Sequence, residues 1–258
     1  MLADTTSRLE TALKAKGDLK LVAYIMAGHP SKKRSIEVGK RLAGSGIAAL
    51  EIGIPHSDPL ADGPVIQHAG QVALQHGMTV EGALEVAQQV AVEGVPVVLM
   101  TYINPVLAYD PRKFAAEAAQ AGVAGVIVPD LPIEEAEPVA AWLRAASLDT
   151  VFMVAPTTPP DRIGDICSHS SGFIYCVTVT GITGARKELP EGIVELLAEV
   201  KKQTTLPVAA GFGISRQDHL KALRGKLDAA VVGSAIVDEI NRAGDGTALV
   251  RELLKACR

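Results

Sequence analysis

One acidic residue, Glu51, stands in an otherwise hydrophobic run, Ala48–Ile54. Side chains alternate along a strand, so Glu51 is expected on the same face as Gly53. A carboxylate inside a protein is costly unless it is paired, protonated or used in catalysis. Apart from Lys20 near the start of the first hydrophobic run, none of the eight runs contains a Lys or Arg that could pair with it. This favours a catalytic Glu51 over a buried ion pair.

Two more carboxylates follow in the segment after this run. Asp58 and Asp62 lie between the prolines Pro55, Pro59 and Pro64. Proline restricts the backbone and so fixes the direction in which neighbouring side chains lie. An Asp in such a loop is either a turn or helix-capping residue or a catalyst. The spacing leaves both interpretations open for each Asp.

A metal site is a further interpretation of this loop, because His56, Asp58 and Asp62 are residue types that bind metals. No second cluster of His or Cys accompanies them, so we expect no metal. The cysteines are odd in number and follow no ligand spacing, which predicts reduced thiols in a cytoplasmic protein. The three are Cys167, Cys176 and Cys257.

Two glycine-containing segments late in the chain, Gly211–Ser215 and Gly233–Val237, could bind an anion. Glycine lets backbone N–H groups approach a phosphate, and the N-terminus of a short helix adds a favourable dipole. Together they indicate a phosphorylated substrate. A third segment, Thr180–Arg186, is either a mobile lid or a plain surface loop.

The elements that must position these residues alternate along the chain. Hydrophobic runs alternate with amphipathic helical segments, which indicates a parallel sheet covered by helices. Eight such units in about 250 residues are typical of one TIM (β/α)8 barrel, here spanning residues 1–258; an open doubly wound sheet is the alternative. The runs are Leu19–Met26, Ala48–Ile54, Val95–Tyr102, Gly125–Asp130, Thr150–Ala155, Phe173–Val177, Pro207–Phe212 and Ala229–Gly233. The helical segments include Ser35–Ala43, Val80–Val92, Pro111–Ala121, Glu134–Ala146 and Gly192–Lys202.

The ends of the helical segments indicate which end of the barrel carries function. Ser7 and Glu10 have capping-box spacing, which predicts an extra helix before the first strand. Gly44, Gly94 and Gly122 end helices just before strands and are expected to be left-handed helix ends. They would lie at the barrel's N-terminal end, so the site is expected at the carboxyl ends of the strands.

Composition excludes several classes of partner. The chain has 258 residues and a formal net charge of −4, and its basic residues are scattered, so we expect no nucleic-acid ligand. The first residues lack the pattern of a signal peptide, and the hydrophobic runs are too short for membrane helices. We therefore expect a cytoplasmic protein that does not bind a membrane.

The motifs, taken together, resemble the tryptophan synthase alpha chain family over essentially the whole chain. The long loop motif is the most specific, whereas the late glycines also occur in other phosphate-binding barrels. The matching stretches are Glu51–Pro64, Tyr102–Pro105, Val128–Pro132, Tyr175, Thr180–Arg186, Gly211–Ile214 and Gly233–Ile236. His56 and Tyr24 depart from the family pattern, because both stand where Phe is usual.

The resemblance implies that Glu51 and Asp62 are the catalytic pair and that the Thr183 loop is a lid. It also implies a beta subunit that carries pyridoxal phosphate, in an alpha2–beta2 tetramer, with no cofactor in this chain. Phosphate would lie near Gly184, Gly213, Gly233 and Ser234. The implied substrate-binding residues are Tyr24, Tyr102, Tyr175, Thr183, Gly184, Phe212, Gly213, Gly233 and Ser234.

The implied reaction is the cleavage of indole-3-glycerol phosphate into indole and glyceraldehyde 3-phosphate. Three alternatives keep the same pocket: a stand-alone lyase without a beta subunit, another phosphate-binding barrel enzyme, and a regulatory subunit that only binds a phosphorylated metabolite. The last would not need two carboxylates. The loop from Glu51 to Asp62 is not the signature of sugar phosphate isomerases or of indole-glycerol phosphate synthase.

Overall fold

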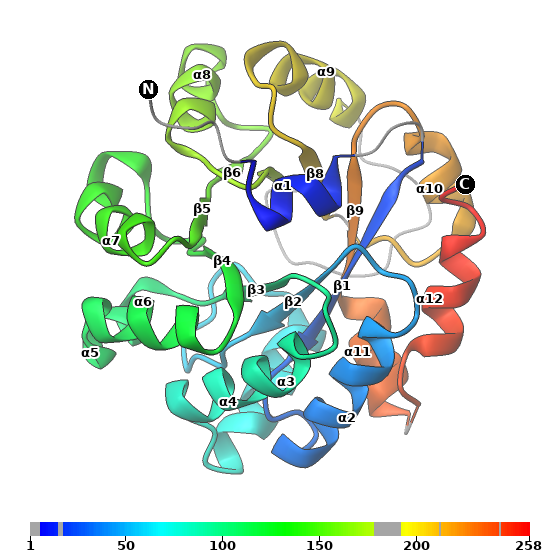
Figure 1. Cartoon of the computed structure of the whole chain (residues 1–258). Helices are drawn as coiled ribbons and strands as arrows, with labels where there is room; N and C mark the ends of the chain where they lie inside the picture. Colours follow the sequence, from blue (N-terminus) through cyan, green and yellow to red (C-terminus); the bar gives the residue numbers. More distant parts are fainter. Residues whose placement is uncertain (1–5, 15–17, 178–191, 212, 243) are drawn as a thin grey trace.

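The computed structural model describes residues 6–14, 18–177, 192–211, 213–242 and 244–258. Its strands form one sheet in which every pair of neighbours is parallel, in the order β5-β4-β3-β2-β1-β9-β8-β7-β6. Helices surround the sheet (Figure 1). The strands are β1 Lys20–Met26, β2 Ala49–Gly53, β3 Val97–Met100, β4 Val123–Ile127, β5 Asp149–Val151, β6 Met153–Val154, β7 Ile174–Val177, β8 Val208–Gly211 and β9 Ala229–Val232.

The sheet is a nearly closed barrel. The two strands at the ends of the sheet order, β5 and β6, are separated in sequence only by Phe152, so they are two halves of the predicted fifth strand. The backbone joins both halves to the β7 side: Ser171 N–H donates to the Thr150 carbonyl at 2.9 Å, and Tyr175 N–H donates to that of Phe152 at 3.1 Å. The predicted TIM barrel is therefore confirmed, and an open sheet is excluded.

The helices between the strands include every helix expected from the sequence, with further helices inside the loops. The loop after β2 contains the helix α3, and the loop after β3 contains α5. The helices are α1 Arg8–Leu13, α2 Lys32–Ala43, α3 Pro64–Gln75, α4 Val80–Ala91, α5 Ile103–Tyr109, α6 Pro111–Gln120, α7 Ile133–Ala145, α8 Pro160–His169, α9 Ile193–Gln203, α10 Gln217–Leu223, α11 Ser234–Asn241 and α12 Thr247–Leu254. In the described ranges, none of them has both the length and the hydrophobicity needed to cross a membrane.

The helix α1 lies across one open end of the barrel (Figure 1). As predicted, Ser7 caps it: the Ser7 hydroxyl accepts a hydrogen bond from the Glu10 N–H at 3.1 Å. Leu9 and Leu13 are fully buried in the cluster of side chains that fills the barrel interior. A Cβ atom at Gly125 of β4 would lie 2.7 Å from a methyl carbon of Leu9. This end is therefore closed by side chains, and a substrate can enter only at the other end.

The glycines at this closed end follow the prediction at two of three positions. Gly94 and Gly122 have φ values of 87° and 78°, in the left-handed region. The expectation for Gly44 is wrong, because its φ is −74°. The Gly44 N–H still donates to the Lys40 carbonyl at 3.1 Å, so the helical turn continues there, and the chain reverses at Gly46 with φ 95°.

Candidate active site

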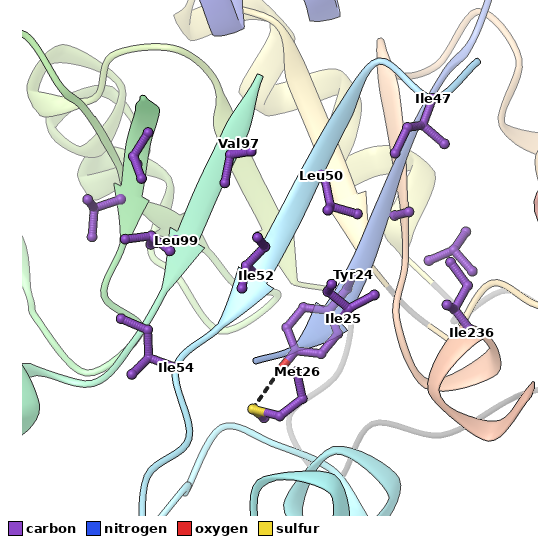
Figure 2. Packing of buried hydrophobic residues seen from close by; sticks show 14 of the residues in the cluster. Tyr24, Ile25, Met26, Ile47, Leu50, Ile52, Ile54, Val97, Leu99 and Ile236 are labelled. Carbon is purple, nitrogen blue, oxygen red and sulfur yellow. Dashed lines mark hydrogen bonds between the residues drawn. The ribbon is translucent and has the colours of Figure 1, made fainter. Parts of the chain in front are cut away.

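The strand β2 places Glu51 inside the barrel. Its neighbours Leu50 and Ile52 are fully buried in the core on the opposite face of the sheet (Figure 2). Glu51 itself is only 2% exposed, and its Oε2 atom has no hydrogen-bond partner among the described residues. Burial, with a smaller contribution from the nearby Asp62, raises the pKa of Glu51 to about 8. A carboxyl in this setting keeps its proton near neutral pH and can donate it.

Lys20 does not change this conclusion. It is the first residue of β1 and pairs in register with Ala229, whereas Glu51 pairs with Tyr24, four residues further along β1. Desolvation and Asp62 account for the pKa of Glu51, and both raise it. Glu51 is therefore a buried carboxyl that interacts electrostatically with a second carboxyl, and no salt bridge to it is formed by the residues that the structure describes.

The loop between β2 and α3 is fixed by hydrogen bonds on both sides of Asp62. The Asp62 N–H donates to the Pro59 carbonyl at 3.0 Å, and the Gln67 side-chain amide donates to the Asp62 carbonyl at 2.9 Å. The preceding Ala61 N–H donates to the Tyr102 hydroxyl at 3.0 Å. These bonds hold the backbone of Asp62 next to the end of β3, from which Tyr102 comes.

The two aspartates of this loop differ in their surroundings. Asp58 is exposed, whereas Asp62 is partly buried and acts electrostatically on Glu51. Burial raises the pKa of Asp62 to about 6, although a hydrogen bond with Tyr102 lowers it in part. Asp62 is therefore largely ionised at neutral pH while Glu51 is largely protonated. Two carboxyl groups with separated pKa values are typical of an acid–base site.

Two tyrosines expected in the pocket lie inside the barrel over strand glycines. Tyr24 is 5% exposed and Tyr175 is 9% exposed. A Cβ atom at Gly211 would lie 2.6 Å from the Tyr175 hydroxyl, and a Cβ atom at Gly53 would overlap the Tyr24 hydroxyl. Burial, together with Glu51 and Asp62, raises the pKa of both tyrosines well above the ordinary value, so both hydroxyls stay protonated.

The close approach of the tyrosines to these two strand glycines was not expected from the sequence, which placed Gly211 in an anion-binding segment and gave Gly53 no role. Gly53 and Gly211 are the last residues of β2 and β8. A glycine within a strand often marks a place where another group approaches closely, and that signal was present in the sequence. It could not identify the approaching group, because the tyrosines come from other strands.

His56 packs in the same loop. Its ring centroid lies 5.1 Å from that of Tyr102, with an angle of 31° between the ring planes. His56 is therefore an aromatic neighbour of the residue that binds the Asp62 loop. No group of three His, Cys, Asp or Glu side chains in the described ranges could hold a metal ion.

The late glycines lie at the carboxyl ends of β8 and β9. Gly213 has a left-handed φ of 67°, and Gly233 precedes the helix α11, whose first residue is the buried Ser234. The first N–H groups of a helix have no carbonyl partner within the helix, so they can bind an anion. The expected site residues Thr183, Gly184 and Phe212 lie outside the described residues.

The comparisons with known proteins agree with this arrangement. The family model described as "Tryptophan synthase alpha chain" matches residues 11–257. The tryptophan synthase alpha chain of Chloroflexus aggregans is 41% identical over 252 residues, which cover 95% of this chain and 94% of that one. The tryptophan synthase alpha chain of Carboxydothermus hydrogenoformans is 45% identical over 228 residues, which cover 88% of this chain and 85% of that one.

Solved structures show the same similarity in three dimensions. A chain of Mycobacterium tuberculosis tryptophan synthase superposes with a TM-score of 0.93 at 34% identity, covering 98% of this chain and 99% of that chain. A mutant tryptophan synthase alpha subunit from Pyrococcus furiosus superposes with a TM-score of 0.86 at 36% identity, covering 93% of this chain and 99% of that chain. With a barrel, two carboxyl groups that interact electrostatically and a match over nearly the whole length, the chain belongs to the tryptophan synthase alpha chain family.

Proposed function

We propose that Glu51 and Asp62 are the catalytic pair for the reaction of this family. The chain is a lyase of tryptophan biosynthesis that cleaves indole-3-glycerol phosphate into indole and glyceraldehyde 3-phosphate. One observation supports the assignment of the pair above all: among the described residues, Glu51 is buried without a paired cation and interacts electrostatically with a second carboxyl group whose pKa is lower. An acid and its ionised partner are what this retro-aldol reaction requires.

Glu51 moves two protons in this mechanism. With a pKa of about 8 it is protonated at neutral pH and donates its proton to C3 of the indole ring. The carboxylate that results then accepts the proton of the hydroxyl group on the first carbon of the side chain. The bond between C3 and that carbon breaks, its electrons return to the ring, and the hydroxyl carbon becomes the aldehyde. Glu51 ends the cycle protonated, as it began.

Asp62 stabilises the charge that develops on the ring. Protonation at C3 leaves positive charge on the indole nitrogen, and an ionised carboxylate that accepts the N–H hydrogen bond lowers its energy. The pKa of about 6 keeps Asp62 ionised at neutral pH. Its backbone is held by bonds to Pro59 and Gln67, so Asp62 lies close to the pocket before the substrate arrives.

The rest of the pocket follows from the strand ends and from the family resemblance. We propose that the phosphate binds at Gly213, Gly233 and Ser234, where helix α11 begins. Tyr175, Tyr102 and Tyr24 would line the pocket between phosphate and indole. For Thr183, Gly184 and Phe212, the proposal of substrate binding and of a lid rests on the family resemblance alone.

The partner is a tryptophan synthase beta subunit, and we propose an alpha2–beta2 tetramer in which that subunit carries pyridoxal phosphate. Two of the large hydrophobic side chains that are exposed in the described ranges lie on the catalytic face: Leu60 is 83% exposed and Leu107 is 54% exposed. Leu60 is in the loop that holds Asp62, and Leu107 is in α5, which also contains Asn104 and Pro105. The Ala61–Tyr102 hydrogen bond joins the two segments. A beta subunit docked here would therefore contact the loop of a catalytic residue.

A substitution of Leu60 tests this docking face. Leu60→Ser removes a side chain whose burial would contribute about 1.5 to 3 kcal/mol, so the affinity for the beta subunit should fall about 10- to 100-fold. Affinity is measured by isothermal titration calorimetry. Val92→Ser is the matched control, because Val92 is 73% exposed but follows α4, at the closed end of the barrel. Equal effects of both substitutions would place the contact elsewhere.

The experiment that tests the whole proposal is an assay of indole release from indole-3-glycerol phosphate by the purified chain, with and without a beta subunit. We expect slow release by the chain alone and faster release with the partner, because a partner docked on Leu60 would further restrict the Asp62 side chain, which the hydrogen bonds of the loop backbone do not hold. A rate that does not respond to the beta subunit would indicate a stand-alone lyase. Absence of indole in both assays would contradict the lyase function itself.

We further propose that the chain acts in the cytoplasm. Cys167, Cys176 and Cys257 are all free and buried in the structure. Free cysteines of this kind are typical of proteins in a reducing compartment. We propose one domain for residues 1–258, since the family model matches almost all of them.

A further inference from the structure

The Tyr24 side chain extends from Gly233, in the proposed phosphate site, to Gly53 on the strand that carries Glu51. Its strand, β1, lies between β9 and β2 in the sheet. A Cβ atom at Gly233, next to the proposed phosphate site, would lie 3.5 Å from the Tyr24 Cβ. At the other end of the ring, a Cβ atom at Gly53 would overlap the hydroxyl. The glycerol chain of a substrate that joins these two sites must therefore pass over Tyr24.

The Tyr24 hydroxyl is poorly satisfied where it lies. In the part of the chain that the structure describes, its hydrogen-bond partner is the Met26 sulfur at 4.0 Å, a long contact to a weak acceptor (Figure 2). Tyr24 is only 5% exposed, and a buried tyrosine hydroxyl usually has a good partner. The group is therefore a donor that is available to a molecule in the pocket.

The nearby carboxyl groups do not take up this donor. Tyr24 is the register partner of Glu51 on the neighbouring strand, and both Glu51 and Asp62 act on it through their charges. Neither forms a hydrogen bond with it. Burial and these two charges keep the phenol neutral, because they raise its pKa well above the ordinary value. A neutral phenol can donate to a hydroxyl oxygen.

We propose that the Tyr24 hydroxyl donates a hydrogen bond to a hydroxyl group of the substrate's glycerol chain and so selects ligands that are hydroxylated there. This inference rests on the proposed function, since it needs a substrate whose phosphate and indole lie at the two ends of Tyr24. Glu51 and Asp62 act on the indole end, and Gly233 lies at the phosphate end. Tyr24 would recognise the part of the substrate between them.

A pair of ligands tests the proposal without turnover. Indole-3-glycerol phosphate and 3-(indol-3-yl)propyl phosphate share the ring, the phosphate and the chain length, but only the first has chain hydroxyls. Binding is measured by calorimetry in the Glu51→Gln background, with and without Tyr24→Phe, which removes only the hydroxyl. We expect Tyr24→Phe to lower the affinity for the hydroxylated ligand about 5- to 10-fold and to change the affinity for the other ligand by less than about 2-fold. Met26→Leu serves as the control, because it removes the sulfur partner and keeps the Tyr24 hydroxyl.

Each other result overturns the inference. If Tyr24→Phe weakens the binding of both ligands equally, or of neither, the Tyr24 hydroxyl does not recognise the glycerol chain of the substrate. The same selective weakening by Met26→Leu would mean that the Tyr24–Met26 contact is responsible instead. The proposed function has its own readout: a wild-type chain that binds indole-3-glycerol phosphate but releases no indole would contradict the lyase role and leave this binding comparison valid. A wild-type chain that does not bind it would contradict both.

Discussion

At the scale of single residues, two carboxyl groups in one pocket differ in ionisation because their surroundings differ. Glu51 has lost nearly all contact with water, and its pKa rises to about 8. Asp62 is less buried and has a hydrogen bond with Tyr102, so its pKa rises only to about 6. At a pH between these two values, Glu51 is protonated and can donate a proton, while Asp62 is ionised.

The Asp62→Asn variant should lower the pKa of Glu51. Removing the negative charge of Asp62 removes the second cause of the shift, while desolvation, the larger cause, remains. The pKa should therefore fall below 8 but stay above the ordinary value of 4.5. A ¹³C NMR titration of the Glu51 carboxyl measures it, with Asp58→Asn as the control because Asp58 is exposed in the same loop. A shift of equal size in both variants would mean that Asp62 does not face Glu51.

The residue types alone identified Glu51 but could not choose between the two aspartates. Glu51 is recognisable because it interrupts a hydrophobic strand. Asp58 and Asp62 stand in the same proline-rich loop, and what separates them is the Tyr102 hydroxyl, which comes from another strand. A contact between residues so far apart in the sequence cannot be predicted from the residues of the loop alone.

At the scale of the elements, the loops at the carboxyl ends of the strands hold the site. Sequence periodicity predicted the strands and the helices that cover them, because burial sets that pattern. It did not predict the helices α3 and α5 inside the loops. α5 has only seven residues, of which only Val106 is buried, so it has little hydrophobic face for periodicity to reveal. These two helices nevertheless carry Gln67, which binds the Asp62 carbonyl, and Leu107, the proposed docking residue.

The Gly233→Ala variant tests the proposed phosphate-binding element. The added methyl group would have its nearest protein contact at 3.5 Å, an ordinary distance, so the fold should tolerate it. It would, however, hinder the approach of a phosphate to the start of α11, and we expect substrate affinity to fall about 10-fold or more. Gly164→Ala on α8, also with a nearest contact of 3.5 Å, is the matched control. Calorimetry with indole-3-glycerol phosphate and with its dephosphorylated form measures the effect, and an unchanged preference for phosphate would exclude this site.

At the scale of the whole molecule, the barrel buries Glu51. Burial raises the pKa of Glu51, which lets it donate a proton, and it also makes the ionised form unfavourable for folding. α1 closes one end with Leu9 and Leu13, which are buried in the cluster of inward-facing side chains. The sequence predicted that α1 exists but not where it packs, since Ser7 and Glu10 specify only its start. The number and order of the predicted strands were enough to predict the barrel topology. They did not predict that the fifth strand is interrupted at Phe152.

The free energy of unfolding should show the cost of burying Glu51. Its pKa is raised in the folded state, so its stabilising contribution is complete below about pH 4.5 and is lost as the pH rises toward 8. Glu51→Gln removes this dependence, because glutamine does not titrate. Urea unfolding at pH 5 and pH 9 should show that the wild type loses stability relative to the variant, on the order of a few kcal/mol. Parallel pH profiles for the two proteins would mean that Glu51 is not buried as described.

The proposed role of Glu51 in transferring the protons of the lyase reaction is tested by the turnover of Glu51→Gln. Glutamine preserves the shape of the side chain but cannot donate and recover a proton, so kcat for indole release should fall about 100-fold or more. The dissociation constant for indole-3-glycerol phosphate should change much less, because the phosphate site and the tyrosines remain. A variant that binds the substrate and releases indole at nearly the wild-type rate would remove Glu51 from the mechanism.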